Sequence, residues 1–472
     1  MIAKKNNDPK ASAISRENKM GTMPVGKLLA NMSIPTMLSM LMQALYNIVD
    51  SAYVAQLGQD ALNGISMAFS VHMLMVAVSG GTAVGMNALL SHSLGEKRQD
   101  LADQTANTSI FLFLSSALVF SILGLLFGRT YYLMLTDIPA IVDYGTDYVT
   151  ICLGLSFGLF AQSCFERMLM STGRTSLAMV STMLGTVVNI ILDPIMIFGL
   201  LGCPRLEVAG AALATVIGQF CAAIFALIMN IRFNPDVHLS LRKIRPHKQV
   251  TAEIYRVAIP SIIMQSIVSV MTFGINKILI SFTDAATAVF GVYYKLNSFV
   301  YMPCFGLNYG IVPIVAYNYG AGRLDRMKQT LKIGICTAMA IMSFGLLVFE
   351  LFPQHLLALF NASEEMMAVG IPALRIIVIH FPMAAFSMVA QSFCQASGHP
   401  KFSMVASICR QLVVMLPAAW LLAQTGNLTL VWFSFPIADF SAVVLNAVFL
   451  RRTLKDVEQK IAAKKGENSL HA

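Results

Sequence analysis

The chain has 472 residues, of which 56% are hydrophobic and 12% are charged, and its mean hydropathy is +0.68. A soluble domain has about 25% charged residues, so this composition excludes a soluble globular protein and predicts an integral membrane protein embedded in a lipid bilayer. Apolar runs of about 20 residues or more suit membrane-crossing helices, whereas a β-barrel would show short alternating segments. The net charge of +9 does not indicate nucleic-acid binding, because the basic residues follow membrane topology.

Twelve membrane-spanning helices are predicted, six in each half of an all-α chain. They cover residues 28–54, 61–93, 103–127, 139–163, 176–201, 207–231, 254–281, 286–318, 328–352, 366–396, 402–424 and 428–450. Residues 1–26 and 453–472 are predicted to be cytoplasmic tails. A basic cytoplasmic linker, residues 232–253, separates an N-lobe, residues 27–231, from a C-lobe, residues 254–452.

The distribution of lysine and arginine predicts that both termini are cytoplasmic. With the amino terminus inside, the external loops keep only Arg129 and Arg205. The positive-inside rule predicts this asymmetry, and the opposite orientation would violate it at nearly every loop. The cytoplasmic segments then carry the central linker and the following residues: Lys97, Arg98, Arg167, Arg174, Arg323, Arg326, Lys328, Lys332, Lys401 and Arg410. We therefore expect a multi-pass protein of the cell membrane.

An internal repeat relates the two halves. Pro35 and Pro260 lie in matching Ile-Pro-Thr and Ile-Pro-Ser contexts, and 260 − 35 = 225. Because each half has an even number of spans, both halves enter the membrane in the same orientation, which predicts two six-helix lobes around a pseudo-twofold axis along the membrane normal. Such lobes can rock around a central cavity, and a monomer suffices. Other pairs keep the offset: Gly85 with Gly310, Gly95 with Gly320, Arg98 with Arg323, Asp100 with Asp325, Gly145 with Gly370, Gly173 with Gly398, and Met179 with Met404.

The most informative polar residues are Asn189 and Asp193, inside the apolar run 176–201. A carboxylate at that depth costs about 2.5–3.5 kcal/mol on insertion scales, so it indicates function. The two residues are four apart and share a helix face, and Pro194 removes a backbone N–H and loosens the turn before it. This arrangement suits a proton, a small cation or a cationic ligand. The alternative is a buried aspartate that bonds to a neighbouring helix for packing.

The first span adds a polar stripe. Gln43, Tyr46, Asn47 and Asp50 fall at i, i+3, i+4 and i+7, so they line one side of an otherwise apolar helix. Counted from the cytoplasmic ends at about 1.5 Å per residue, Asp50 reaches the outer part of the bilayer, as Asp193 does. Equal depth permits a shared site.

Two acids in one partly dry cavity can exchange cations. Proton or Na⁺ binding at Asp50, Asn189 and Asp193 would compete with a cationic substrate, and that competition is the basis of antiport. Thr215 and Gln219 on the sixth span are further candidate ligands. The alternative role for Thr215 and Gln219 is hydrogen bonding between helices.

The second half carries different charges. Asp50 and Asp193 correspond by offset to Ile275 and Ala418. Four other ionisable residues are instead predicted to be buried there, as a possible C-lobe cavity: Lys277, Lys295, Arg375 and Asp439. Asp439 and one of these bases are expected either to form an intramembrane ion pair or to contact substrate.

No catalytic or cofactor motif is supported. The eight cysteines form no C-x-x-C pair, so neither a disulfide framework nor a zinc site is predicted. The G-x-S-x-G match at residues 154–158 lies in a predicted membrane helix, without the strand that a nucleophile elbow needs. No Walker loop is present, so neither ATP nor another cofactor is expected, and no enzymatic activity is predicted.

Four segments together resemble the multidrug and toxic compound extrusion (MATE) transporters, in particular the bacterial MepA-like branch. They are Asn189–Gly199, Gly210–Thr215, Pro313–Tyr319 and Gln395–Gly398. The resemblance extends from Lys27 to about Arg452. It implies twelve helices in two lobes, alternating access, and export of cationic amphipathic compounds coupled to inward H⁺ or Na⁺.

The resemblance also assigns site residues. Asp50, Asn189 and Asp193 match the family's amino-terminal-lobe cation site, and Tyr46 and Thr215 are weaker matches. Pro35 also matches the first-helix proline that bends during transport.

The resemblance is incomplete in the second half. The carboxyl-lobe acids of some Na⁺-coupled members, however, have no evident match.

The leading hypothesis is a secondary antiporter that exports organic cations. The alternative is a flippase of the related lipid-carrier exporters, which commonly have a basic cavity for anionic headgroups, as Lys277, Lys295 and Arg375 would provide. A passive channel is a third possibility, but the lobe repeat and interrupted helices favour alternating access.

Overall fold

The computed structural model describes residues 18–360 and 362–470, and every regular element in this part of the chain is helical. The first tail is predicted at residues 1–26, of which 1–17 lie outside the described residues. The α-helices are α1 (Lys19–Thr22), α2 (Val25–Ala55), α3 (Gln59–Gly95), α4 (Gln99–Leu133), α5 (Pro139–Gly154), α6 (Phe157–Ser171), α7 (Thr175–Phe198), α8 (Glu207–Phe233), α9 (Lys248–Leu279), α10 (Asp284–Gly320), α11 (Leu324–Leu351), α12 (Pro353–Ala358), α13 (Glu364–Val378), α14 (Phe381–Ala396), α15 (Pro400–Ile408), α16 (Leu416–Ala423), α17 (Leu428–Val431) and α18 (Ser434–Leu470).

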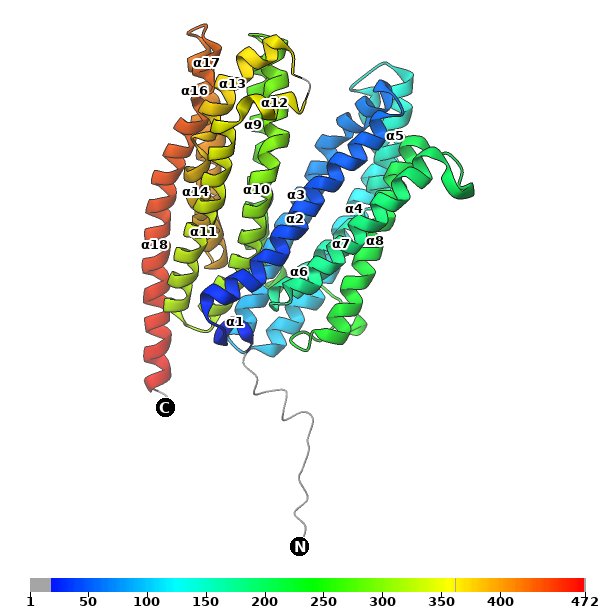
Figure 1. Cartoon of the computed structure of the whole chain (residues 1–472). Helices are drawn as coiled ribbons and strands as arrows, with labels where there is room; N and C mark the ends of the chain where they lie inside the picture. The colour runs from blue at the N-terminus through cyan, green and yellow to red at the C-terminus, as the bar shows by residue number, and fades with distance from the viewer. Residues whose placement is uncertain (1–17, 361, 471–472) are drawn as a thin grey trace.

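The helices form two six-span lobes, α2–α8 and α9–α18, which agrees with the predicted fold class (Figure 1). Ten helices within the described residues are long and apolar enough to cross a membrane. Two bent pairs, α5 with α6 and α13 with α14, complete the twelve spans, with bends of 43° and 44°. The predicted continuous spans at 139–163 and 366–396 are therefore each broken near their middle. A π-helical segment, Cys409–Met415, also interrupts the span formed by α15 and α16.

The two lobes touch at one end only, the end that carries α1, which we call the α1 end. There α2 packs along α10 and α3 along α9, and the lobes diverge towards the opposite, far end (Figure 1). A Cβ on Gly95 would lie 2.0 Å from the carbonyl oxygen of Tyr317, and a Cβ on Gly320 would lie 2.2 Å from that of His92. Gly95 and Gly320 are a repeat pair, so the interface obeys the pseudo-twofold axis. The hydroxyl of Thr36 also donates across it to the Gly306 carbonyl oxygen over 2.7 Å.

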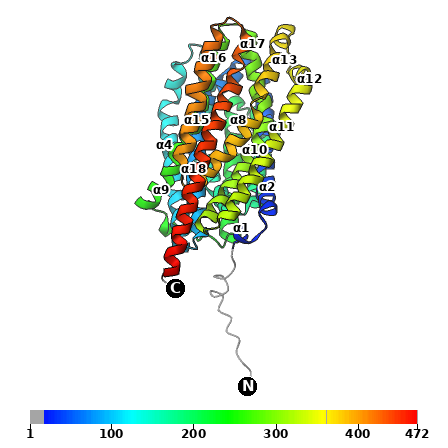
Figure 2. The same ribbon diagram turned by 90° about the vertical axis from the view of Figure 1, so that its left-hand side faces the viewer.

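Both ends of the described chain help to hold the lobes together. The α1 segment accepts hydrogen bonds from the second lobe, because Nη2 of Arg326 donates to the carbonyl oxygens of Met20 and Met23 over 3.0 and 2.7 Å. At the other end, α18 continues as a helix through most of the predicted second tail and extends beyond its lobe (Figure 2). Nζ of Lys464 on this extension lies 2.6 Å from Oε1 of Glu96, just after α3.

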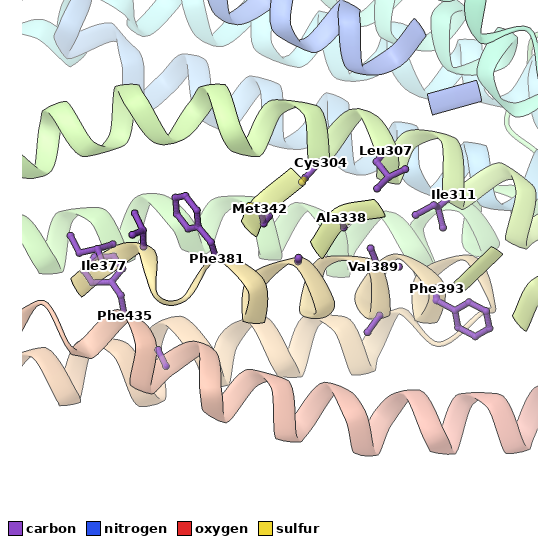
Figure 3. Close-up of a cluster of buried hydrophobic side chains, with 14 of the residues drawn as sticks. Cys304, Leu307, Ile311, Ala338, Met342, Ile377, Phe381, Val389, Phe393 and Phe435 are labelled. Atoms are coloured by element: carbon purple, nitrogen blue, oxygen red, sulfur yellow. The ribbon is translucent and has the colours of Figure 1, made fainter. Parts of the chain in front are cut away.

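Each lobe has an apolar core, and the core of the second lobe continues into α2 through Leu28, Leu29 and Met32 near the α1 end. In the second lobe, side chains from α10, α11, α13, α14 and α18 interdigitate, including Phe381 at the start of α14 and Phe435 on α18 (Figure 3). The first-lobe core joins α3, α4, α5 and α6. Large apolar side chains such as Leu126 and Phe440 are more than 60% exposed, which suits a surface that contacts lipid rather than water.

Candidate functional site

Tight packing of α7 against α8 positions the polar residues of the first lobe. A Cβ on Gly185 would lie 2.8 Å from the carbonyl oxygen of Gly218, and a Cβ on Gly218 would lie 2.6 Å from that of Gly185. Small residues let membrane helices approach this closely. The hydroxyl of Ser181 also donates to the Ala222 carbonyl oxygen over 2.8 Å. Asn189, one turn beyond Gly185, is thereby held against α8.

Asn189, Asp193 and Thr215 form one buried polar cluster. Nδ2 of Asn189 donates to Oδ1 of Asp193 and to Oγ1 of Thr215, each over 3.2 Å, as the i, i+4 spacing on α7 predicts. Asp193 is 0% exposed and Asn189 is 3% exposed. Oδ1 of Asn189 and Oδ2 of Asp193 have no hydrogen-bond partner among the described residues. The cluster therefore presents two buried acceptor oxygens that no donor satisfies.

The first span brings a second carboxylate to this cluster, because α2 packs along α7. Asp50 interacts electrostatically with Asp193, and Tyr46 interacts with both acids. Oδ1 of Asp50 is a third buried oxygen without a partner in the described part of the chain. Asn47 is exposed, since neighbouring helical residues point about 100° apart, and the structure does not bring it into the cluster.

The predicted bending point of α2 is connected to α7. Pro35 lacks an N–H, so the carbonyl oxygen of Asn31, four residues earlier, loses its helical donor. The hydroxyl of Thr175, the first residue of α7, donates to that oxygen over 3.3 Å. The two helices that carry the acids are thus also joined near the α1 end.

Sequence reasoning missed the contribution of α5 to this site. Tyr148 and Cys152, four apart on α5, interact electrostatically with Asp50, and Tyr148 also interacts with Tyr46. Their i, i+4 spacing was the available signal. One helical turn beyond the two acids, Val54 and Ile197 belong to a small apolar cluster against which Tyr148 packs.

Three bases of the second lobe that were predicted to be buried are exposed, which corrects the prediction of their burial. Lys277 and Lys295 are exposed on α9 and α10. Arg375 is 53% exposed and lies 3.8 Å from Glu350 on α11. Long basic side chains near helix ends reach towards water and so avoid the cost of burial. None of the three pairs with Asp439.

Asp439 instead lies between Arg410 and His380. Nη1 of Arg410 donates to Oδ1 of Asp439 over 2.9 Å and to Oδ2 over 3.3 Å, and Nδ1 of His380 is 2.9 Å from Oδ2. Asp439 is fully buried, as predicted, but its base comes from the π-helical segment. Arg410 is therefore not a cytoplasmic residue at a loop, as its place in the positive-inside pattern implied. Its position well inside the predicted span 402–424 was the signal that should have indicated burial.

The first-lobe site has the chemistry of a cation or proton site. Three buried oxygens, from Asp50, Asn189 and Asp193, lack donors, and no basic side chain among the described residues is bonded to either acid. Two nearby carboxylates share a proton or bind a cation more readily than they both stay charged in a dry site. Oxygen ligands of this kind suit hard cations. The cluster can thus hold one positive species and exchange it for another.

Comparison with known proteins places the chain in a family. The sequence profile of the family described as MatE matches residues 35–195 and 260–421, one segment in each lobe. "Multidrug export protein MepA" from Staphylococcus haemolyticus (strain JCSC1435) is 25% identical over 431 residues, which cover 91% of this chain and 94% of that protein. "Probable multidrug resistance protein YoeA" from Bacillus subtilis (strain 168) is 23% identical over 421 residues, which cover 87% of this chain and 90% of that protein.

Solved structures share the fold. One described as "Outward-facing conformation of a multidrug resistance MATE family transporter of the MOP superfamily" aligns with a TM-score of 0.89 at 24% sequence identity, covering 94% of this chain and 99% of that chain. Another, "Crystal structure of MATE in the bent conformation", aligns with a TM-score of 0.86 at 23% identity, covering 96% and 99%. Since the two segments that match the profile make up more than half of the chain, this protein belongs to the MatE family.

Proposed function

We propose that this protein is a secondary multidrug antiporter that exports cationic amphipathic compounds in exchange for H⁺ or Na⁺. The observation that carries the proposal is the group of three unsatisfied buried oxygens at Asp50, Asn189 and Asp193. A site that is short of positive charge binds either a coupling ion or an organic cation, but not both with full affinity. That competition drives exchange without ATP or another cofactor.

The arrangement of the lobes supports alternating access. The lobes touch only at the α1 end, and the acids lie on the parts of α2 and α7 nearer the far end. With both termini in the cytoplasm, as the positive-inside pattern predicts, this conformation is closed to the cytoplasm and diverges towards the outside. Rocking of one lobe against the other around the central site would expose the acids to each side in turn.

The names of the relatives also favour drug export over the flippase alternative. The proteins from Staphylococcus haemolyticus and Bacillus subtilis are described as a multidrug export protein and a probable multidrug resistance protein. A single chain contains both lobes, so we propose that a monomer is functional.

The test is transport by the full chain in proteoliposomes, with a pH gradient and a Na⁺ gradient imposed separately. Efflux of a cationic dye should follow one of the two gradients and should stop in Asp50→Asn, which keeps the size of the side chain but removes its charge. Asp60→Asn is the matched control, because Asp60 is an exposed acid in the first turn of α3. Unchanged gradient-driven efflux in Asp50→Asn would refute the proposal.

A further inference from the structure

The second lobe contains an ionisable cluster that the exchange mechanism above does not use. His380 is 4% exposed and Asp439 is 0% exposed, whereas Arg410 keeps 22% of its side chain exposed. The cluster lies deep in the lobe, where the break between α13 and α14, the π-helical segment and α18 meet. Phe381 and Phe435 border it, with ring centroids 5.2 and 6.1 Å from that of His380.

Both ring nitrogens of His380 have partners. Nδ1 faces Oδ2 of Asp439 at 2.9 Å, and Nε2 faces the hydroxyl of Tyr293 at 3.1 Å. In neutral His380, Nδ1–H donates to the carboxylate and Nε2 accepts from the tyrosine hydroxyl. After protonation both nitrogens donate, and the Tyr293 oxygen accepts instead. The same positions therefore satisfy the neutral and the charged imidazole.

The charge balance also permits protonation. With His380 neutral, Arg410 and Asp439 cancel, and one added proton gives the cluster a charge of +1. The Asp439 carboxylate can accept from Arg410 and from a charged His380 at once, because its two oxygens face the two partners.

Few other titratable groups face His380. From α10 these are Tyr293, Tyr294 and Tyr301, and the Tyr301 hydroxyl lies 3.5 Å from Nδ1. From α18 and the π-helical segment they are Asp439 and Arg410. From α11 the nearby side chain is Phe349, which packs on Phe381, and Glu350 is paired with Arg375. Cys304 on α10 interacts with Tyr301.

The repeat shows that the bend between the two half-helices does not need this cluster. The first lobe makes nearly the same bend, 43° against 44°, with Leu155 at the position that corresponds to His380 by the offset of 225. Arg410 corresponds to Gly185, on an uninterrupted α7. In the second lobe, the break between α13 and α14 and the π-helical segment are thus both accompanied by ionisable residues that the first lobe lacks. Broken membrane helices with buried charge are typical of ion sites.

We propose that His380, held between Asp439 and Tyr293, is a second proton-binding site of this protein, and that it makes the second lobe sensitive to pH. The proton adds to Nε2 of His380, and the Tyr293 hydroxyl changes from donor to acceptor. The site goes beyond the antiport proposal, because it binds its proton whether the first lobe couples to H⁺ or to Na⁺.

The test is a nitrogen-15 NMR titration of the histidines in the full-length protein in lipid nanodiscs. The signal of His380, identified by its loss in His380→Gln, should pass from the neutral to the doubly protonated form as the pH is lowered. Asp439→Asn should lower the protonated fraction at a given pH, because it removes the anionic partner. Arg410→Gln should raise that fraction, because it removes a neighbouring cation. Arg129→Gln and Asp143→Asn, at an exposed ion pair of the first lobe, should leave it unchanged.

A His380 signal that stays neutral at every pH at which the protein is folded, or that responds to neither cluster variant, would overturn the proposal and leave a structural hydrogen-bond network. Where a cluster variant does not fold, a chain in which the other histidines are replaced gives the same titration with the cluster intact. The measurement needs no transport, so its failure and the failure of the antiport proposal are distinguishable.

Discussion

The two lobes repeat one backbone but carry opposite chemistry. In the first lobe, Asp50 and Asp193 have unsatisfied oxygens and no bonded base among the described residues. The corresponding residues of the second lobe, by the offset of 225, are Ile275 and Ala418. There the buried acid, Asp439, is neutralised by Arg410. The repeat therefore conserves the packing of the helices, while each lobe has acquired its own buried charges.

This difference predicts which lobe binds a cation. An acid without a base must find a positive partner from outside the protein, whereas an acid that accepts two bonds from a guanidinium already has one. We therefore place the exchanged cation in the first lobe and assign the ion pair of the second lobe to holding its helices together. The predictions below test this division in order of decreasing effect.

The largest effect is expected when the Arg410–Asp439 pair is broken on one side. Removing one partner of a buried ion pair costs about 3–5 kcal/mol, whereas replacing both partners by apolar residues is often nearly neutral. Asp439→Leu should therefore lower the thermal unfolding temperature of the purified protein sharply, and Arg410→Leu combined with Asp439→Leu should recover much of it. A double variant no more stable than the single variant would show that the pair does not hold the lobe together.

Asp193→Asn should have the next largest effect, on transport rather than on folding. A buried carboxylate costs about 2.5–3.5 kcal/mol, and a cation that neutralises it can gain that free energy, which corresponds to about a 100-fold change in affinity. The variant should therefore weaken binding of the coupling ion about 100-fold and abolish gradient-driven dye efflux, while its unfolding temperature stays close to that of the parent. Proteoliposome efflux against ion concentration measures the shift. Loss of stability with normal coupling would instead indicate an aspartate that serves packing alone.

Much of the fold could be predicted from the sequence because it depends on patterns that are local or periodic. Span lengths follow from apolar runs, the parallel repeat follows from one constant offset, and the family resemblance was confirmed by the profile match in both lobes. The contact of Asn189 with Asp193 was also accessible, since residues i and i+4 of a helix are neighbours.

The partners of buried charges could not be predicted in the same way. Asp439 pairs with Arg410, 29 residues away in the chain, and Arg410 lies in a π-helical segment. No sequence periodicity marks such a segment. The breaks that place His380 and Ser156 at helix junctions were missed for a similar reason, since apolar composition continues through both breaks. The basic residues Lys277, Lys295 and Arg375 were wrongly predicted to be buried, because hydropathy ignores how far a long side chain can reach.

The contact between the lobes also predicts a position where only glycine fits. At Gly95 a Cβ would lie 2.0 Å from the backbone oxygen of Tyr317 in the other lobe. Overpacking of this kind costs about 1–3 kcal/mol, so Gly95→Ala should force the lobes apart at the α1 end and depopulate the present conformation. Distances between spin labels on the two lobes would report the change. Gly291→Ala, where no atom lies within 4 Å of the added Cβ, should leave the distances unaltered. If Gly95→Ala has the same distance distribution as the parent protein, the contact between Gly95 and the Tyr317 backbone accommodates the methyl group and the prediction is wrong.

The smallest effect is expected at the ion pair between Lys464 and Glu96, which joins the lobes outside their cores. Partial burial alone would raise the pKa of Glu96, but the hydrogen bond from Lys464 and the nearby charges of His92, Lys464 and Arg98 lower it below its ordinary value. A carboxylate with a lowered folded-state pKa adds stability above its unfolded pKa, about 4.3, and loses it as the pH falls through the folded value.

Lys464→Ala should therefore destabilise the contact by less than about 1 kcal/mol at neutral pH, because the pair is partly exposed, and by nothing once Glu96 is protonated. Spin-label distances across the α1 end, measured from neutral pH down to about pH 3, would show parent and variant converging as the carboxylate is neutralised. A difference that persists at low pH would mean that Lys464 acts by packing its stem rather than through its charge.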